Sequence, residues 1–166
     1  MNWWNYLFNI LTIICTVFSI FGAYKSISHY KKSERLALFV KSDVAFNESR
    51  KIIDLFTALQ KLANKYCRKR GINLERAASE IGEKIKVSIN TIRENLPNED
   101  LKEIYNSFNS QQLNAETYVE SFITGTVVAN GELVIDEDFY KCQQIFKDMQ
   151  LFIKERHENI SEKIKK

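Results

Sequence analysis

Apart from its many charged groups, the chain has few side chains that could do chemistry. Its 166 residues include two histidines, His29 and His157, and three cysteines, Cys15, Cys67 and Cys142. The sequence contains no glycine-rich phosphate loop, no H-E-x-x-H zinc motif, no G-x-S-x-G nucleophile motif and no paired cysteines. Its carboxylates fall on amphipathic patterns, where runs of charge usually face solvent. We therefore predict no enzyme, no metal site and no cofactor.

Arg156 and His157 are the most unusual polar pair, because they interrupt an apolar stripe in the last predicted helix. A charged group on an apolar face must find a partner. We expect an ion pair with a glutamate, either within the chain or between subunits. The second hypothesis treats the two residues as the remnant of an RNA-cutting site.

A second polar set lies inside an apolar N-terminal run. Residues 1–24 contain no charged side chain, and residues 6–24 would span about 28 Å as a helix, enough for a bilayer core. Polar residues recur there at alternating spacings of three and four, which places them on one face. The polar stripe defined in this way comprises Asn5, Asn9, Thr12, Thr16 and Ser19. Lipid offers such groups no hydrogen-bond partners, so the stripe should join helices or line a pore, and both roles require self-association.

Aromatic and basic residues flank this run. Two tryptophans precede it, a tyrosine ends it and several lysines follow, as is typical of a spanning helix with its C-terminal side in the cytoplasm. A cleaved signal peptide would have a basic region before the run and a small-x-small site after it, and the sequence has neither. The residues expected at the membrane interface are Trp3, Trp4, Tyr24, Lys25, Lys31 and Lys32.

Residues 25–166 carry every charged side chain and are predicted to form one helical domain. Its first helix should continue from the span as far as Gly71, with a break at 41–47 as the alternative. Periodicity and capping residues predict later helices at about 74–95, 98–109, 114–129 and 137–164. The predicted fold class is all-α: a single N-terminal transmembrane helix (1–24) followed by a cytoplasmic antiparallel helical bundle (25–166).

This arrangement resembles the small membrane accessory protein of type VI-B CRISPR systems, whose helical domain is HEPN-like. HEPN nucleases carry an arginine a few residues before a histidine near the end of a bundle helix. Here His157 has a similar place, but the nearest arginine is the adjacent Arg156, so the nuclease motif is not reproduced. The resemblance implies an oligomeric ring that permeabilises the bacterial inner membrane and strengthens RNA-guided antiphage defence.

The sequence thus predicts a pore-forming or pore-gating membrane protein with its N-terminus outside and its bundle in the cytoplasm. Five or more subunits would be needed to enclose water, given helix diameters of about 10 Å. The expected partners are membrane lipid, further copies of the chain and, functionally, an RNA-guided CRISPR nuclease. No direct nucleic-acid binding is predicted, since the net charge is only +3. Two alternatives stay open: a non-conducting anchor for a cytosolic partner, and a membrane-tethered HEPN-like ribonuclease.

Overall fold

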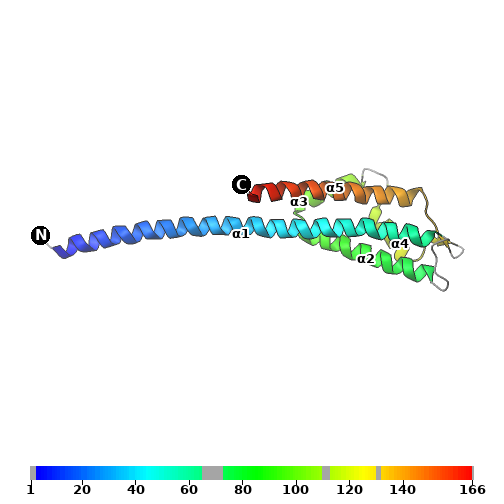
Figure 1. Ribbon diagram of the computed structural model, residues 1–166, viewed down its shortest axis with the longest axis horizontal. Coiled ribbons are helices and arrows are strands. Elements are labelled where there is room, and N and C mark those ends of the chain that lie inside the picture. The colour runs from blue at the N-terminus through cyan, green and yellow to red at the C-terminus, as the bar shows by residue number, and fades with distance from the viewer. Residues whose placement is uncertain (1–2, 65–72, 110–112, 130–131, 166) are drawn as a thin grey trace. The chain divides into compact units, whose positions relative to one another are not determined.

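The computed structural model describes residues 3–64, 73–109, 113–129 and 132–165, and within them the side chains of all but 5–10, 107–109 and 165. The described residues are almost entirely helical, as predicted. The helices are α1 (Trp3–Ala63), α2 (Leu74–Asn95), α3 (Asn98–Asn109), α4 (Ala115–Ile123) and α5 (Glu137–Lys165), and the antiparallel strands are β1 (Val128–Ala129) and β2 (Glu132–Leu133) (Figure 1). The chain forms two compact units, Met1–Leu38 and Phe39–Lys166.

Local capping explains where two of the helices begin. The Asn73 side chain accepts a hydrogen bond of 3.1 Å from the Arg76 backbone N–H, and α2 starts at the next residue. The Asp136 carboxylate accepts one of 2.9 Å from the Phe139 N–H in the first turn of α5. Each cap satisfies a backbone donor that has no partner inside the helix. The predicted starts of both helices are confirmed.

Two predicted helix ends are wrong. The first helix ends at Ala63, where Asn64 follows; asparagine is frequent at helix C-termini, and the residues around Gly71 lie outside the described part of the chain. The helix expected over 114–129 ends at Ile123, because Gly125 adopts a positive φ of 77° and the β-branched residues after it favour the short hairpin. The break considered at 41–47 is absent, since α1 is helical throughout.

The core of the Phe39–Lys166 unit is built around Phe56. Its ring lies 5.4 Å from the ring centroids of both Phe139 and Phe146 and 6.4 Å from that of Phe122. All four side chains are fully buried. These contacts join α1, α4 and α5, so aromatic packing between residues far apart in sequence holds this unit together.

Helices α2 and α4 pack closely because a glycine lies between them. A Cβ placed on Gly82 would lie 3.0 Å from Ile123 Cγ1 and 3.1 Å from Phe122 Cβ. The Lys86–Glu120 ion pair, at 3.0 Å, also joins these helices. The absence of a side chain at Gly82 therefore sets how near the two helices approach.

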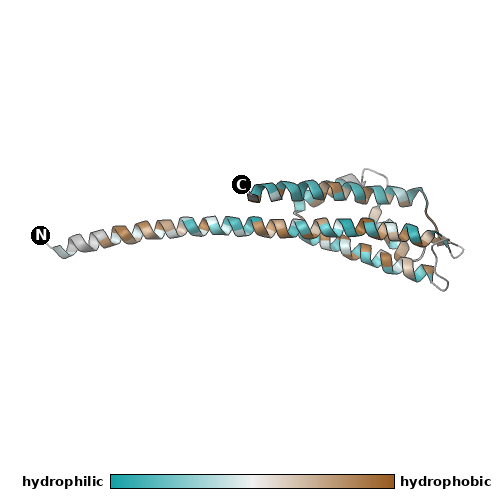
Figure 2. Ribbon diagram, viewed as in Figure 1, coloured by the Kyte–Doolittle hydropathy of each residue, from teal (hydrophilic) through white to brown (hydrophobic). Residues whose placement is uncertain are grey.

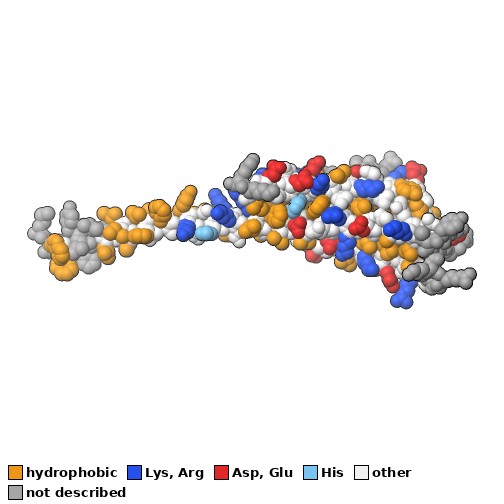
Figure 3. Space-filling view, in the orientation of Figure 1, with side chains coloured by type: hydrophobic (Ala, Val, Ile, Leu, Met, Phe, Trp, Pro, Cys, Tyr) orange, Lys and Arg blue, Asp and Glu red, His pale blue; other side chains and the backbone are white. Residues whose placement is uncertain are grey.

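The Met1–Leu38 unit consists of the N-terminal part of α1. Its apolar residues follow one another along the helix in Figure 2 and their side chains stand out from it in Figure 3. No described side chain of residues 11–38 is buried. This segment gains no apolar packing from its own unit.

Candidate functional site

The first feature of the candidate site is the exposed apolar surface of α1. Phe18 and Phe21 are 73% and 72% exposed, and most of their apolar neighbours are similarly open. Among the described residues, one helix, α1, contains a stretch long and apolar enough to cross a membrane, and none of that stretch is buried within the chain. Such a surface is unfavourable in water, so it requires an apolar surrounding.

The polar stripe lies on this helix, and two of its hydroxyls bond to their own backbone. Thr16 Oγ1 donates to the Thr12 carbonyl at 2.8 Å, and Ser19 Oγ donates to the Cys15 carbonyl at 2.8 Å. Each hydroxyl has a single O–H, so its donor is satisfied one turn back along the helix. Only the hydroxyl acceptor capacity is left for a neighbouring helix or water. The side chains of Asn5 and Asn9 lie outside the described part of the chain.

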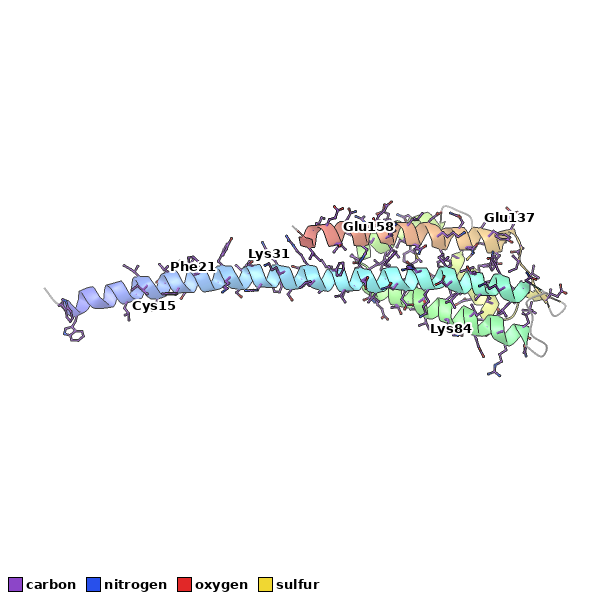
Figure 4. All side chains as sticks on the ribbon, viewed as in Figure 1. Cys15, Phe21, Lys31, Lys84, Glu137 and Glu158 are labelled. Atoms are coloured by element: carbon purple, nitrogen blue, oxygen red, sulfur yellow. The ribbon has the colours of Figure 1, made fainter. Side chains whose placement is uncertain are left out.

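The residues predicted for the membrane interface are all exposed on α1. Trp3 and Trp4 pack edge to face, with ring centroids 5.6 Å apart. Tyr24 is 76% exposed, and the lysines that follow it are also open. Figure 4 shows Phe21 and Lys31 extending to one side of the helix and Cys15 to the other.

The second candidate feature is the polar pair on α5, of which Arg156 turns toward α3. Its guanidinium lies 3.1 Å from Asp100 and 3.2 Å from Glu103, and it covers the Phe152 ring at 5.2 Å. The predicted intrabundle ion pair with a glutamate is therefore present. Burial raises the pKa of Asp100 above its ordinary value, and the nearby Arg156 charge only partly opposes that rise.

His157 turns the other way, toward α1. Its ring is stacked between Phe39 and Phe46, at centroid distances of 5.0 and 5.7 Å, and its side chain is 17% exposed. Its Nδ1 lies 3.0 Å from Ser42 Oγ, and its Nε2 lies 3.8 Å from an Asp43 oxygen. Ser42 Oγ also donates to the Phe39 carbonyl at 2.8 Å, which fixes the serine side chain beside the imidazole.

The structure thus directs Arg156 and His157 to different partners and does not bring them together in one site. The partners of His157 were missed from the sequence because Ser42 lies 115 positions earlier. One signal was available. Phe39, Ser42, Asp43 and Phe46 occupy positions i, i+3, i+4 and i+7, so they share a helical face.

The thiols and acidic groups do not form a reactive cluster in the described ranges. Cys142 is fully buried and its Sγ donates weakly to the Ala115 carbonyl at 3.8 Å. Burial raises the pKa of this thiol, which makes it a poor nucleophile at neutral pH. Cys15 is exposed on α1, while Cys67 lies outside the described residues. Within those residues, no three His, Cys, Asp or Glu side chains gather as a metal site would require.

Comparison of the chain with protein-family models, with curated proteins and with solved structures found no match.

Proposed function

We propose that this protein is an oligomeric, single-span membrane protein whose N-terminal helices form or gate a pore. The observation that carries the proposal is the exposed apolar segment of α1 before Lys25, on which Thr12, Thr16 and Ser19 share one face. A monomeric anchor gains nothing from polar groups on a lipid-facing surface, whereas a ring of helices can turn them toward water or toward one another.

The orientation and setting of this pore follow from the flanking charges and from the family resemblance. Basic residues after Tyr24 favour a cytoplasmic location for the helical bundle, which we take to be HEPN-like. By the resemblance to type VI-B accessory proteins, the pore would permeabilise the bacterial inner membrane. Membrane leak in an infected cell would then strengthen the defence begun by an RNA-guided nuclease.

One observation favours a second candidate, a non-conducting membrane anchor. The Thr16 and Ser19 hydroxyls already donate to carbonyls of their own helix. Threonine and serine bonded in this way lie in lipid at little cost, so these two residues do not by themselves demand a polar environment. In this alternative the bundle binds a cytosolic partner and the helix only holds it at the membrane.

The mass of the detergent-solubilised protein, with detergent counted separately, distinguishes the two functions. The pore requires a closed assembly of about five or more subunits that conducts ions in a planar bilayer.

Replacing Asn9 and Thr16 together with leucine should abolish the conductance and leave insertion intact. The matched control replaces Ile14 and Phe18 with leucine, which changes the same helix away from the polar stripe and should conduct normally. Unchanged conductance in the stripe variant would contradict a pore lining.

The anchor makes the opposite prediction for the whole span. Exchanging residues 1–24 for an unrelated spanning helix should preserve function if the bundle acts by binding a partner. If the exchange abolishes both oligomerisation and function while the protein still inserts, the anchor is excluded.

A further inference from the structure

A cationic face lies on α1 immediately after the apolar run. Tyr24, Ser28, Lys31, Lys32 and Arg35 line one hollow along the helix surface, together with Ile27. Counted from Tyr24, they occupy positions i, i+3, i+4, i+7, i+8 and i+11, so they share a helical face. All of them belong to the Met1–Leu38 unit and all are exposed, and Figure 3 shows basic side chains directly beyond the apolar ones. The face is open to a ligand along its whole length.

The charge on this face is not neutralised by the chain. Residues 24–38 contain four lysines and arginines but one carboxylate, Glu34. Among the residues that the structure describes, Lys31, Lys32 and Arg35 form no ion pair, although Lys86, Lys141 and Arg156 of the other unit do. The face therefore presents uncompensated positive charge and attracts an anion.

The cationic face points away from the polar stripe. At 100° per residue, its centre lies about 140° around the helix from the centre of Thr12, Thr16 and Ser19. On the same count it lies within about 40° of Val17 and Phe21, which belong to the apolar surface. If the polar stripe faces neighbouring helices, the cationic face is directed toward surrounding lipid.

The depth of the face fits the headgroup layer. Lys31 follows Tyr24 by seven residues, or about 10 Å along a helix, and Arg35 follows by about 16 Å. Side chains on a helix lean toward its N-terminus, which here is the membrane side, and long basic side chains extend further in that direction. Both charged groups therefore reach the phosphate level from the aqueous side.

We propose that the cationic face binds the phosphate of anionic phospholipid headgroups in the leaflet on the bundle side. The inference rests on the proposed membrane insertion but not on a pore. The Arg35 guanidinium donates two parallel hydrogen bonds to a phosphate, and the lysines add charge. The hydroxyls of Tyr24 and Ser28 offer neutral donors to the glycerol and phosphate oxygens. Such binding would make the orientation and assembly of the helices sensitive to lipid composition.

The test uses the full chain in nanodiscs of phosphatidylcholine with a minor fraction of phosphatidylglycerol, and counts retained lipids by native mass spectrometry after gentle detergent extraction. The variant carries Lys31→Gln, Lys32→Gln and Arg35→Gln, and keeps Lys25 and Lys41 so that the orientation is preserved. The matched control carries Lys84→Gln, Lys102→Gln and Lys147→Gln, which removes the same charge from exposed positions of the Phe39–Lys166 unit.

We expect the preference for phosphatidylglycerol over phosphatidylcholine to fall roughly 100-fold in the variant, because three cations at the membrane surface are removed. The control should keep the wild-type preference. Equal retention of phosphatidylglycerol by wild type and variant would overturn the proposal, as would an equal loss in the control. Excess inorganic phosphate should not displace the lipid; displacement would show a site for free anions instead. Flotation with neutral vesicles tests insertion separately, and a chain that inserts as a monomer but selects phosphatidylglycerol would contradict the pore and support this proposal.

Discussion

Phenylalanine side chains are buried in one compact unit of this chain and exposed in the other. In the Phe39–Lys166 unit, Phe56 and the three phenylalanines around it are fully buried against one another. In the Met1–Leu38 unit, Phe18 and Phe21 lie almost three-quarters exposed. One unit supplies the apolar surroundings of its own phenylalanines, while the other must obtain them from outside the chain.

The charged residues repeat this contrast. Basic side chains of the Phe39–Lys166 unit pair with carboxylates, as Arg93 does with Glu116 and Arg156 does with Asp100. The described cations of residues 25–35 have no such partners. The Phe39–Lys166 unit thus provides partners for many of its own apolar and charged groups, whereas described residues 11–35 leave apolar surface and positive charge open to their surroundings.

The largest expected effect contrasts Phe56→Ala with Phe21→Ala. Removing the buried ring leaves a cavity among three aromatic neighbours, so the free energy of unfolding of the Phe39–Lys166 unit should fall by about 3–5 kcal/mol. Phe21→Ala should leave it unchanged, because that ring contacts nothing in the core. Urea unfolding in detergent, followed by far-UV circular dichroism, measures both. A similar loss in the two variants would contradict the independence of the units.

The second largest effect is expected when a lysine replaces an exposed apolar residue in each unit. Phe18→Lys puts a cation near the middle of the apolar run, which should make insertion less favourable by about 3 kcal/mol, or roughly 100-fold. Leu151→Lys changes a residue of α5 that is also exposed, at 57%, and should not alter insertion. The fraction of protein resistant to alkaline extraction from membranes reports the difference. Full membrane retention of Phe18→Lys would contradict a position of residue 18 near the middle of the bilayer core.

The sequence predicted the parts of this fold that local chemistry determines. Asn73 and Asp136 identify the starts of α2 and α5 because a capping side chain acts on a backbone N–H only three residues away. The end of α4 was misplaced because the periodicity of Tyr118, Val119 and Phe122 carries no information about the positive φ at Gly125. A turn conformation that depends on one glycine is weakly encoded in hydrophobic spacing.

The candidate sites show the same limit. The spacing of Thr12, Thr16 and Ser19 predicts a shared face, but it does not specify the side-chain rotamers that direct two hydroxyls to their own backbone. The sequence likewise indicates that His157 needs partners without naming Ser42, because a contact across 115 positions depends on how α1 and α5 pack. Faces are readable from periodicity, whereas long-range pairs require the folded bundle.

A smaller effect on stability is expected when alanine replaces one glycine in each unit. Alanine at either position gains helix propensity worth about 1 kcal/mol. At Gly82 the new Cβ would press on Ile123 and Phe122, and overpacking of about 1–3 kcal/mol should exceed the gain, for a net loss of about 1 kcal/mol. At Gly22 no atom lies within 4 Å, so the gain should remain.

Urea unfolding measures the Gly82→Ala change, and amide hydrogen exchange of the neighbouring residues in detergent measures the Gly22→Ala change. If both substitutions stabilise, the close approach of α2 and α4 around Gly82 is looser than the structure indicates. If Gly22→Ala weakens oligomerisation, that position lies in a helix–helix interface rather than against lipid.

The smallest effect concerns the partly buried ion pair between Asp100 and Arg156, which contrasts with the described cations of residues 25–35, for which the structure shows no ion pair. Burial raises the folded-state pKa of Asp100 above its ordinary value of 3.8, despite the arginine. A carboxyl with a raised folded pKa contributes stability below its unfolded pKa and loses that contribution as the pH rises through the folded value. Ionised Asp100 is therefore slightly unfavourable in the folded state at neutral pH, and Asp100→Asn should raise neutral-pH stability slightly, by less than about 1 kcal/mol.

The same substitution should also remove part of the decline in stability between acid and neutral pH, which urea unfolding at the two pH values measures. Glu103→Gln is the matched comparison, because its carboxylate also contacts Arg156 but its side chain is 61% exposed. Its charge adds to the raised pKa of Asp100, so its removal should reduce the decline with pH, but by less than Asp100→Asn does. A clear loss of stability in Asp100→Asn at neutral pH, absent at acid pH, would mean that attraction to Arg156 outweighs burial. In that case charge pairing would stabilise the bundle outright, and the contrast with the described cations of residues 25–35 would be sharper.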